Sequence, residues 1–426
     1  MNWLYNTSWL AALPGIVCYL WLCRLVTGKY RRNLRPRFGL DLEVPQRPGS
    51  NQVIWVHALS VGEVLSVLPL VHLLREEYPS HELVFSTTTE SGNQLARKRL
   101  AGDGCPVFYL PLDLWWVVRR VVERVGARLF LLVETDLWPN LPRYLSRQGA
   151  LTVVVNGRIS DRSFPRYRLF RPFLGSTLSH ITRFCMQAEE DARRLLVLGV
   201  PPDRVRVTGN LKIDQPIPIS PGEERTLLRH RLGWVPRGPV WIAGSTHPGE
   251  EEIVFRVFGQ LRRRFPKLCL AVAPRRPERG GEVAALAQGA GWRTGRRSLM
   301  GAVSAETDVF VLDSIGELAG FYSLGTFAFV GGSLVPSGGH NPVEAAQRGL
   351  PVVFGPHMTN FRDIAAILRK SGGGFQVANE AGLAQRLERW LDALEVCAQD
   401  GERAKRALSG HGGAARRTME VIRELL

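Results

Sequence analysis

Short apolar runs that alternate with amphipathic stretches are the feature that most limits how this chain can fold. The expected strands of the first half are residues 53–57, 83–86, 107–110, 129–133, 151–155, 184–187 and 205–208. Helical patterns lie between them, at residues 64–76, 114–125 and 189–198. Alternation of strands with helices predicts a parallel sheet, and continuously apolar strands predict a sheet that is covered on both faces.

A second set of alternating runs follows a proline-rich interruption at residues 213–222. Its expected strands are residues 240–243, 268–273, 309–312, 327–330, 352–354 and 375–377, with helices at 250–265, 281–288, 342–347 and 361–370. We therefore expect two doubly wound α/β domains that face each other across a cleft. The expected divisions are 1–38, 39–212, a linker at 213–222, and 223–426, with the last helix returning to the first domain. Ligands of such sheets bind beyond the carboxyl ends of the strands.

The charge balance limits the partners. The chain has 55 Lys and Arg against 39 Asp and Glu, a net charge of +16, which favours an anionic partner: nucleic acid, anionic lipid or a phosphorylated substrate. Six cysteines are scattered without a C-x-x-C pair, so the sequence predicts neither a zinc site nor a disulfide framework.

The first residues resemble a membrane segment. No residue from Met1 to Cys23 is charged, and residues 3–26 are apolar enough to suggest a span of the bilayer or a helix in its interface. The following flank is basic, with Arg24, Lys29, Arg31, Arg32, Arg35 and Arg37. By the positive-inside rule, the flank and the rest of the chain stay in the cytoplasm. A buried helix and a cleaved signal peptide are the alternatives.

Two acidic sites follow expected strands of the first half. Glu63 lies in the first turn of the helix after residues 53–57, where it either complements the helix dipole or serves as a carboxylate base. Glu134 and Asp136 follow residues 129–133, beside Trp138 and Asn140. Either Asp136 caps a helix, with Glu134 as a solvated neighbour, or the cluster belongs to a site.

An arginine-rich segment at residues 156–171 interleaves basic and aromatic side chains. Its basic residues include Arg158, Arg162 and Arg166. Arginine binds phosphate through a planar fork and aromatic side chains favour the membrane interface, so this segment is suited to a phosphorylated lipid. A solvated basic face is the alternative, and nucleic acid is less favoured because no recognition motif accompanies the charge.

Glycine-rich turns follow the expected strands of the second half. Residues 243–250 and 273–279 each lie between a strand and a helix, and backbone N–H groups at such helix starts bind phosphate. The run at 330–344 combines glycines with Pro342 and Glu344 at a helix start, an arrangement suited to a nucleoside. His340 and His357 lack the accompanying carboxylates of a metal site, so no metal is expected.

Taken together, these runs resemble the family of 3-deoxy-D-manno-octulosonic acid (Kdo) transferases of lipopolysaccharide assembly. The matching motifs, all in family order, are Val61-Gly-Glu-Val64, Glu134-Thr-Asp-Leu-Trp-Pro-Asn140, Gly209-Asn-Leu-Lys212, Pro274-Arg275, Gly316-Glu-Leu318 and Gly338-Gly-His-Asn-Pro-Val-Glu344. The resemblance implies a GT-B fold, CMP-Kdo as donor, a lipid A precursor with two phosphates as acceptor, inversion at the anomeric carbon and no metal or other cofactor. It also implies an enzyme anchored at the cytoplasmic face of the inner membrane, with no nucleic acid partner.

The resemblance also assigns residues. Glu63 is implied as the general base, while Glu134 and Lys212 are implied to stabilise the transition state. The segments implied to bind CMP contain Pro274, Arg275, Ile315, Gly316, Glu317, Asn341, Pro342, Val343 and Glu344. Asp136, Arg276 and Ser337 depart from the residues more common in the family, which places fine donor contacts in question.

Two other functions fit parts of the sequence. One is a GT-B glycosyltransferase that uses another nucleotide sugar, since glycine-rich loops suit any nucleotide. The other is a non-catalytic membrane scaffold that binds lipid through its arginines. The scaffold would leave the nucleotide-type motifs without a role.

Overall fold

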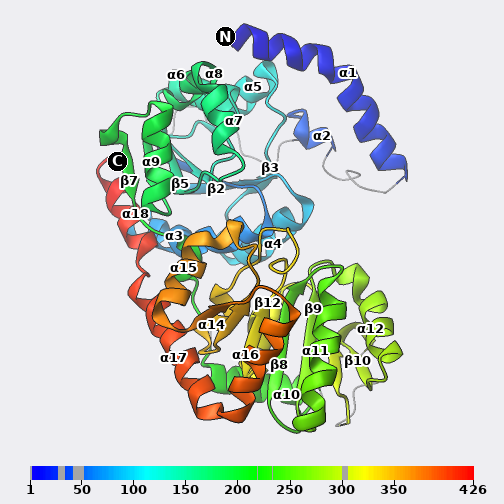
Figure 1. Ribbon diagram of the computed structural model, residues 1–426. Helices are drawn as coiled ribbons and strands as arrows, with labels where there is room; N and C mark the ends of the chain where they lie inside the picture. The colour runs from blue at the N-terminus through cyan, green and yellow to red at the C-terminus, as the bar shows by residue number, and fades with distance from the viewer. Residues whose placement is uncertain (1, 27–33, 42–51, 218, 233, 300–305) are drawn as a thin grey trace. The chain divides into compact units, whose positions relative to one another are not determined.

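The computed structural model describes residues 2–26, 34–41, 52–217, 219–232, 234–299 and 306–426 (Figure 1). Lys29, Arg31 and Arg32 of the basic flank lie outside the described residues. The chain divides into two compact units. Unit 1 comprises Met1–Gln215 and Gly412–Leu426, and unit 2 comprises Pro216–His411. The final helix thus belongs with the first part of the chain.

Unit 1 is built on a parallel sheet of seven strands among its described residues. Their spatial order is β3 (Val107–Tyr109), β2 (Glu82–Thr87), β1 (Val53–Ala58), β4 (Leu129–Val133), β5 (Leu151–Gly157), β6 (Arg183–Met186) and β7 (Val205–Val207). Strands β1, β3 and β4 are wholly buried, and β2, β5 and β6 are buried at all but their first residue, as expected for strands covered on both faces. All seven expected strands of the first half are therefore confirmed, with ends displaced by two residues at most.

Helices cover both faces of this sheet. One face packs against α3 (Val61–Glu77), α4 (Glu90–Leu100) and α18 (Ala414–Arg423), which comes from the C-terminus and lies beside α3 (Figure 1). The other face packs against α5 (Trp115–Val125), α6 (Asn140–Arg147), α8 (Arg171–Leu178) and α9 (Glu189–Leu198). Shorter helices are α2 (Leu34–Arg37) and α7 (Phe164–Leu169).

Unit 2 repeats the plan with a second parallel sheet. Its described strands lie in the order β10 (Thr294–Arg296), β11 (Val309–Val311), β9 (Cys269–Pro274), β8 (Val240–Thr246), β12 (Phe327–Val330), β13 (Val352–Phe354) and β14 (Gly374–Gln376). Helices α11 (Glu250–Arg264), α12 (Gly280–Gly289) and α16 (Glu380–Asp392) pack on one face. The remaining helices are α10 (Pro221–Leu232), α13 (Leu318–Phe321), α14 (Val343–Gln347), α15 (Arg362–Ser371) and α17 (Leu394–Gly410). Strand β10 was not predicted, because Thr-Gly-Arg has no apolar pattern.

The N-terminal segment forms helix α1 (Asn2–Val26). No helix in the described part of the chain combines the length and the apolar character that a membrane crossing requires, so the span suggested for residues 3–26 is not found. Polar side chains such as Asn6 and Thr7 lower the apolar character of this segment. Asn6 accepts a hydrogen bond from Asn140 Nδ2 (2.8 Å), and Tyr5 donates one to Asp113 (2.9 Å). Trp9 and Leu13 pack against the core of unit 1.

Candidate active site

The carboxyl ends of β1 and β4 define the candidate catalytic site of unit 1. Strand β1 pairs with β2 on one side and with β4 on the other, so the chain leaves these two central strands in opposite directions. Open α/β sheets bind ligands at this kind of switch point. Glu63 lies in the first turn of the helix after β1, and Glu134 directly follows β4. Both lie where the sequence predicted a site.

Glu63 is held at the start of α3 by two short contacts. Its carboxylate accepts a hydrogen bond from Leu59 N (2.7 Å) and another from Ser60 Oγ (3.1 Å). Burial raises the pKa of Glu63 to about 7, and the neighbouring Glu134 carboxylate acts in the same direction. A carboxyl with a pKa near neutral pH is matched to general-base catalysis. The helix-start role and the base role are thus compatible in one residue.

Glu134 forms an ion pair with Lys212 that joins distant parts of unit 1. Lys212 Nζ lies 2.8 Å from Glu134 Oε1, and the two side chains are only 15% and 25% exposed. Glu134 has a φ of +60°, a conformation uncommon outside glycine. Such a backbone is retained where the surrounding structure requires it, frequently at functional sites.

A network of amides positions Lys212. Asn156, buried at the end of β5 with a φ of +55°, accepts a hydrogen bond from Leu211 N (3.0 Å). Asn210 accepts one from Lys212 N (3.0 Å) and donates one to Gln187 (2.9 Å). The sequence did not assign a role to Asn156 or Gln187, although Asn156 follows one expected strand and Gln187 ends another.

The helix cap that was weighed for Asp136 is made by another residue. Asp136 accepts a hydrogen bond from Trp138 Nε1 (2.9 Å). The backbone N–H groups of Asn140 and Leu141, at the start of α6, donate instead to the buried carboxylate of Asp113 (2.9 and 3.1 Å). Asp113 lies far from α6 in sequence, so spacing alone did not reveal it. Burial raises the pKa of Asp113 to about 7.

The arginines assigned to the acceptor lie beyond β5. Arg158 is partly buried and its carbonyl accepts a hydrogen bond from the Thr135 hydroxyl. Arg162, just before α7, and Arg166, within α7, are both exposed. Their exposure fits a phosphate-binding face and a solvated basic face equally.

The sheet of unit 2 has a corresponding switch point between β8 and β12. His247 follows β8 and His340 follows β12, with their Nε2 atoms 2.8 Å apart and their rings nearly parallel. Burial lowers the pKa of His340 to about 4, helped by the positive charge of Arg275. The pair is therefore neutral near pH 7, with one ring donating to the other. Among the described residues, no group of three or more His, Cys, Asp or Glu side chains is arranged to hold a metal ion.

Glu250 fixes the loops around this histidine pair. Its fully buried carboxylate accepts hydrogen bonds from the backbone N–H groups of His247, Gly332, Ser333 and Leu334, at 2.6–3.0 Å. The composition of these loops was evident from the sequence, but the role of Glu250 was not. Three N–H groups of the glycine-rich run are thus engaged by protein.

The first residues assigned to the donor follow strands β9 and β11 of the same sheet. Arg275 follows β9, is exposed, and donates its backbone N–H to Thr246 O (2.9 Å). Ile315 is 74% exposed and Gly316 has a φ of +83°. Glu317 is occupied by ion pairs with Arg297 and Arg231, and the Arg297 guanidinium lowers its pKa. We therefore infer that the Glu317 carboxylate orders this turn.

The helix start after the glycine-rich run is ordered by Asn341. Its side chain accepts a hydrogen bond from Val343 N (3.1 Å) and donates one to Glu344 Oε1 (3.2 Å). Burial raises the pKa of Glu344. Pro342, with a φ of −85°, precedes the helix and adds no free N–H. Asn341 thus links the Glu344 carboxylate to the backbone at this helix start.

Comparison with known proteins connects these sites to one family. Residues 32–215 match the family model described as 3-deoxy-D-manno-octulosonic-acid transferase (kdotransferase). The 3-deoxy-D-manno-octulosonic acid transferase of Haemophilus influenzae is 34% identical over 425 residues, covering 99% of this chain and 98% of that protein. The enzyme of the same name from Chlamydophila psittaci is 35% identical over 352 residues, covering 82% and 80%.

Solved structures support the fold. A glycosyltransferase from Rickettsia africae has a TM-score of 0.62 at 11% identity, and covers 88% of this chain and 98% of its own. UDP-GlcNAc 2-epimerase from Neisseria meningitidis has a TM-score of 0.60 at 14% identity, covering 87% and 99%. At these identities the likeness concerns architecture alone, namely two parallel α/β sheets of GT-B type.

The relatives match along nearly the whole chain, and the motifs that carried the resemblance lie at or after the carboxyl ends of strands in both sheets. A non-catalytic scaffold is therefore set aside. The chain belongs to the 3-deoxy-D-manno-octulosonic acid transferase family and is a glycosyltransferase.

Proposed function

We propose that the enzyme transfers Kdo from CMP-Kdo to a lipid A precursor with two phosphates, for lipopolysaccharide assembly at the cytoplasmic face of a bacterial inner membrane. The names of the relatives support the transferred sugar. One observation carries the mechanism: Glu63 has a pKa of about 7 and lies beside Glu134, which suits a general base.

In the proposed reaction, the Glu63 carboxylate takes the proton from an acceptor hydroxyl. The hydroxyl oxygen then forms a bond to the anomeric carbon of Kdo while the bond from that carbon to the CMP phosphate oxygen breaks. CMP leaves with the electron pair, and the configuration inverts. Lys212, held by Glu134, supplies positive charge for the transition state, where fixed charges contribute most. The proposal requires no metal ion.

The donor is proposed to bind at the strand ends of unit 2. Arg275 offers an unobstructed guanidinium to the phosphate of CMP, and the turn at Ile315–Glu317 and the helix start at Asn341–Glu344 contact the nucleoside. Hydrogen-bond acceptors such as Glu344 suit ribose hydroxyls.

Association with the membrane is proposed to use the surface of unit 1. Trp3 and Trp21 of α1 and Trp115 of α5 are exposed, as are the basic side chains of Arg162 and Arg166. Exposed tryptophan and arginine favour the interface of an anionic bilayer.

Mass spectrometry of the products formed from CMP-Kdo and the tetraacyldisaccharide bisphosphate acceptor tests this proposal. Wild-type enzyme should yield an acceptor heavier by at least one Kdo, and Glu63→Ala should yield none while still binding CMP-Kdo. Competition by CMP, UDP and GDP identifies the nucleotide. Preference for UDP or GDP would favour a different donor sugar, and normal turnover by Glu63→Ala would remove the assigned base.

A further inference from the structure

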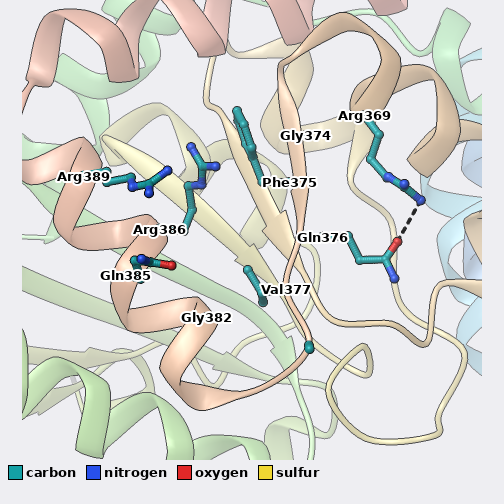
Figure 2. A pocket seen from close by; sticks show the side chains of 10 residues that line it. Arg369, Gly374, Phe375, Gln376, Val377, Gly382, Gln385, Arg386 and Arg389 are labelled. Atoms are coloured by element: carbon teal, nitrogen blue, oxygen red, sulfur yellow. Dashed lines mark hydrogen bonds between the residues drawn. The ribbon is translucent and has the colours of Figure 1, made fainter.

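A basic pocket lies at the open edge of the sheet in unit 2 (Figure 2). It has a volume of about 430 Å³ and is bounded by the edge strand β14, helix α16 and the end of α15. Arg369, Arg386 and Arg389 line it, and none of its lining residues is acidic. It shares no residue with the segments assigned to CMP, so it is separate from the proposed donor site.

The charges of α16 are divided between two faces of the helix. Its acidic side chains pair with α11: Glu380 with Arg256 (2.7 Å), and Glu388 and Asp392 with Arg264 (2.9 and 2.8 Å). These carboxylates are therefore engaged away from the pocket. The arginines of the same helix, one turn apart on its other face, are left to line the pocket (Figure 2).

The pocket arginines are ordered by neutral groups. The guanidinium carbon of Arg386 lies 3.9 Å from the centroid of the Phe375 ring, and Arg369 donates a hydrogen bond to Gln376 Oε1 (2.9 Å) (Figure 2). Within the described residues, no carboxylate lies at ion-pair distance from either arginine or from Arg389. Stacking on an aromatic ring leaves the N–H edges of a guanidinium available for a ligand.

Repulsion within this cluster is only partly relieved by the protein. Burial and the charge of Arg389 lower the pKa of Arg386. Asp400 acts on Arg386 in the opposite sense, but its carboxylate already accepts hydrogen bonds from Arg403 (2.8 Å) and Trp390 (3.0 Å). An anion in the pocket would relieve this repulsion and satisfy the open N–H groups together.

We propose that this pocket binds a phosphate-type polyanion, namely a pyrophosphate or phosphate-ester group. Arginine forks match the paired oxygens of phosphate, and the amides of Gln376 and Gln385 add neutral donors. A pocket of this size accommodates a small phosphate compound or a lipid headgroup. These two sources share the same chemistry and are distinguished by experiment.

Calorimetric titration of the full-length protein with inorganic pyrophosphate is the direct test. The double variant Arg386→Gln/Arg389→Gln should bind about tenfold more weakly or worse. The matched control Arg229→Gln/Lys405→Gln removes the same charge from exposed positions of unit 2 and should bind within about twofold of wild type. Unchanged circular dichroism and thermal unfolding establish that both variants fold.

A second arm identifies the source of the phosphate group. Co-sedimentation with phosphatidylcholine vesicles, with and without phosphatidic acid, measures headgroup binding. Arginine-dependent binding to the acidic vesicles without pyrophosphate binding would support the pocket with a lipid ligand. Arg275→Gln should leave pyrophosphate binding at this pocket intact, which separates it from the proposed donor site. Equal losses in the pocket and control variants, or no binding of either probe by wild type, would overturn the proposal.

Discussion

The switch points of the two sheets differ in the side chains that they bring together. In unit 1, the carboxylates of Glu63 and Glu134 lie near each other with Lys212, and burial together with their mutual repulsion moves the pKa of Glu63 toward neutral pH. In unit 2, His247 and His340 form a neutral pair. Under the proposed mechanism, proton transfer belongs to the first site and binding of the anionic donor belongs to the second.

The largest effect should follow removal of the charge at Glu63. Glu63→Gln keeps the hydrogen-bond acceptor for Leu59 N but cannot take a proton, so kcat should fall about 10²–10⁴-fold. Steady-state kinetics measures this, and calorimetry should find CMP-Kdo affinity within about threefold of wild type. A parallel loss of donor affinity would contradict the division of tasks between the two sites.

Removal of a buried carboxylate should affect stability more in unit 2 than in unit 1. Glu250 accepts four backbone N–H groups whereas Asp113 accepts two, so Glu250→Ala should destabilise by about 3–5 kcal/mol and Asp113→Ala by about 2–3 kcal/mol. Urea unfolding measures both values. The exposed Glu123→Ala, which loses only a surface pair with Arg119, should change stability by about 0.5 kcal/mol or less. A larger loss for Asp113→Ala than for Glu250→Ala would refute this ranking.

A substitution at the proposed donor site should raise KM for CMP-Kdo rather than lower kcat. Arg275→Gln removes the guanidinium proposed to bind the CMP phosphate, so KM for CMP-Kdo should rise about 10–100-fold with little change in kcat. Arg276→Gln, an exposed neighbour, provides the control. If Arg275→Gln lowered kcat alone, the residue would act in the reaction step instead.

The smallest effect should be that of pH on donor binding. His340 has a pKa of about 4 and burial lowers the pKa of His247 below its ordinary value, so the histidine pair stays neutral between pH 7 and pH 8, and the phosphodiester of CMP-Kdo stays ionised. Calorimetry between pH 7 and pH 8 should find affinity constant within about twofold. A steep fall in affinity over this range would show that a protonated histidine holds the donor.

The strands were predictable because buried parallel strands are continuously apolar, as residues 129–133 and 327–330 illustrate. Strand β10 lacks that pattern and was not predicted. Glu63, Glu134 and Lys212 were found through their motifs, but their contacts were not. The cap of α6 by Asp113 and the pairing of His247 with His340 join residues distant in sequence, and tertiary packing alone creates them.

The N-terminal segment shows the limit of composition as a guide. The absence of charge in residues 3–23 suggested a membrane span, yet Tyr5 and Asn6 form hydrogen bonds with unit 1. Absence of charge is a weaker criterion than high hydropathy, because uncharged polar side chains such as Asn6 and Thr7 lower the apolar character of the segment.

The pH dependence of kcat/KM tests the role of Glu63 most directly, because its acidic limb reports the pKa of the base in the free enzyme. Only the deprotonated carboxylate accepts a proton, so activity should rise with pH through an apparent pKa of about 7. Glu134→Gln should move this limb to lower pH, since it removes a negative charge beside Glu63. A wild-type limb near the ordinary pKa of a glutamate, or one that Glu134→Gln leaves in place, would contradict the account.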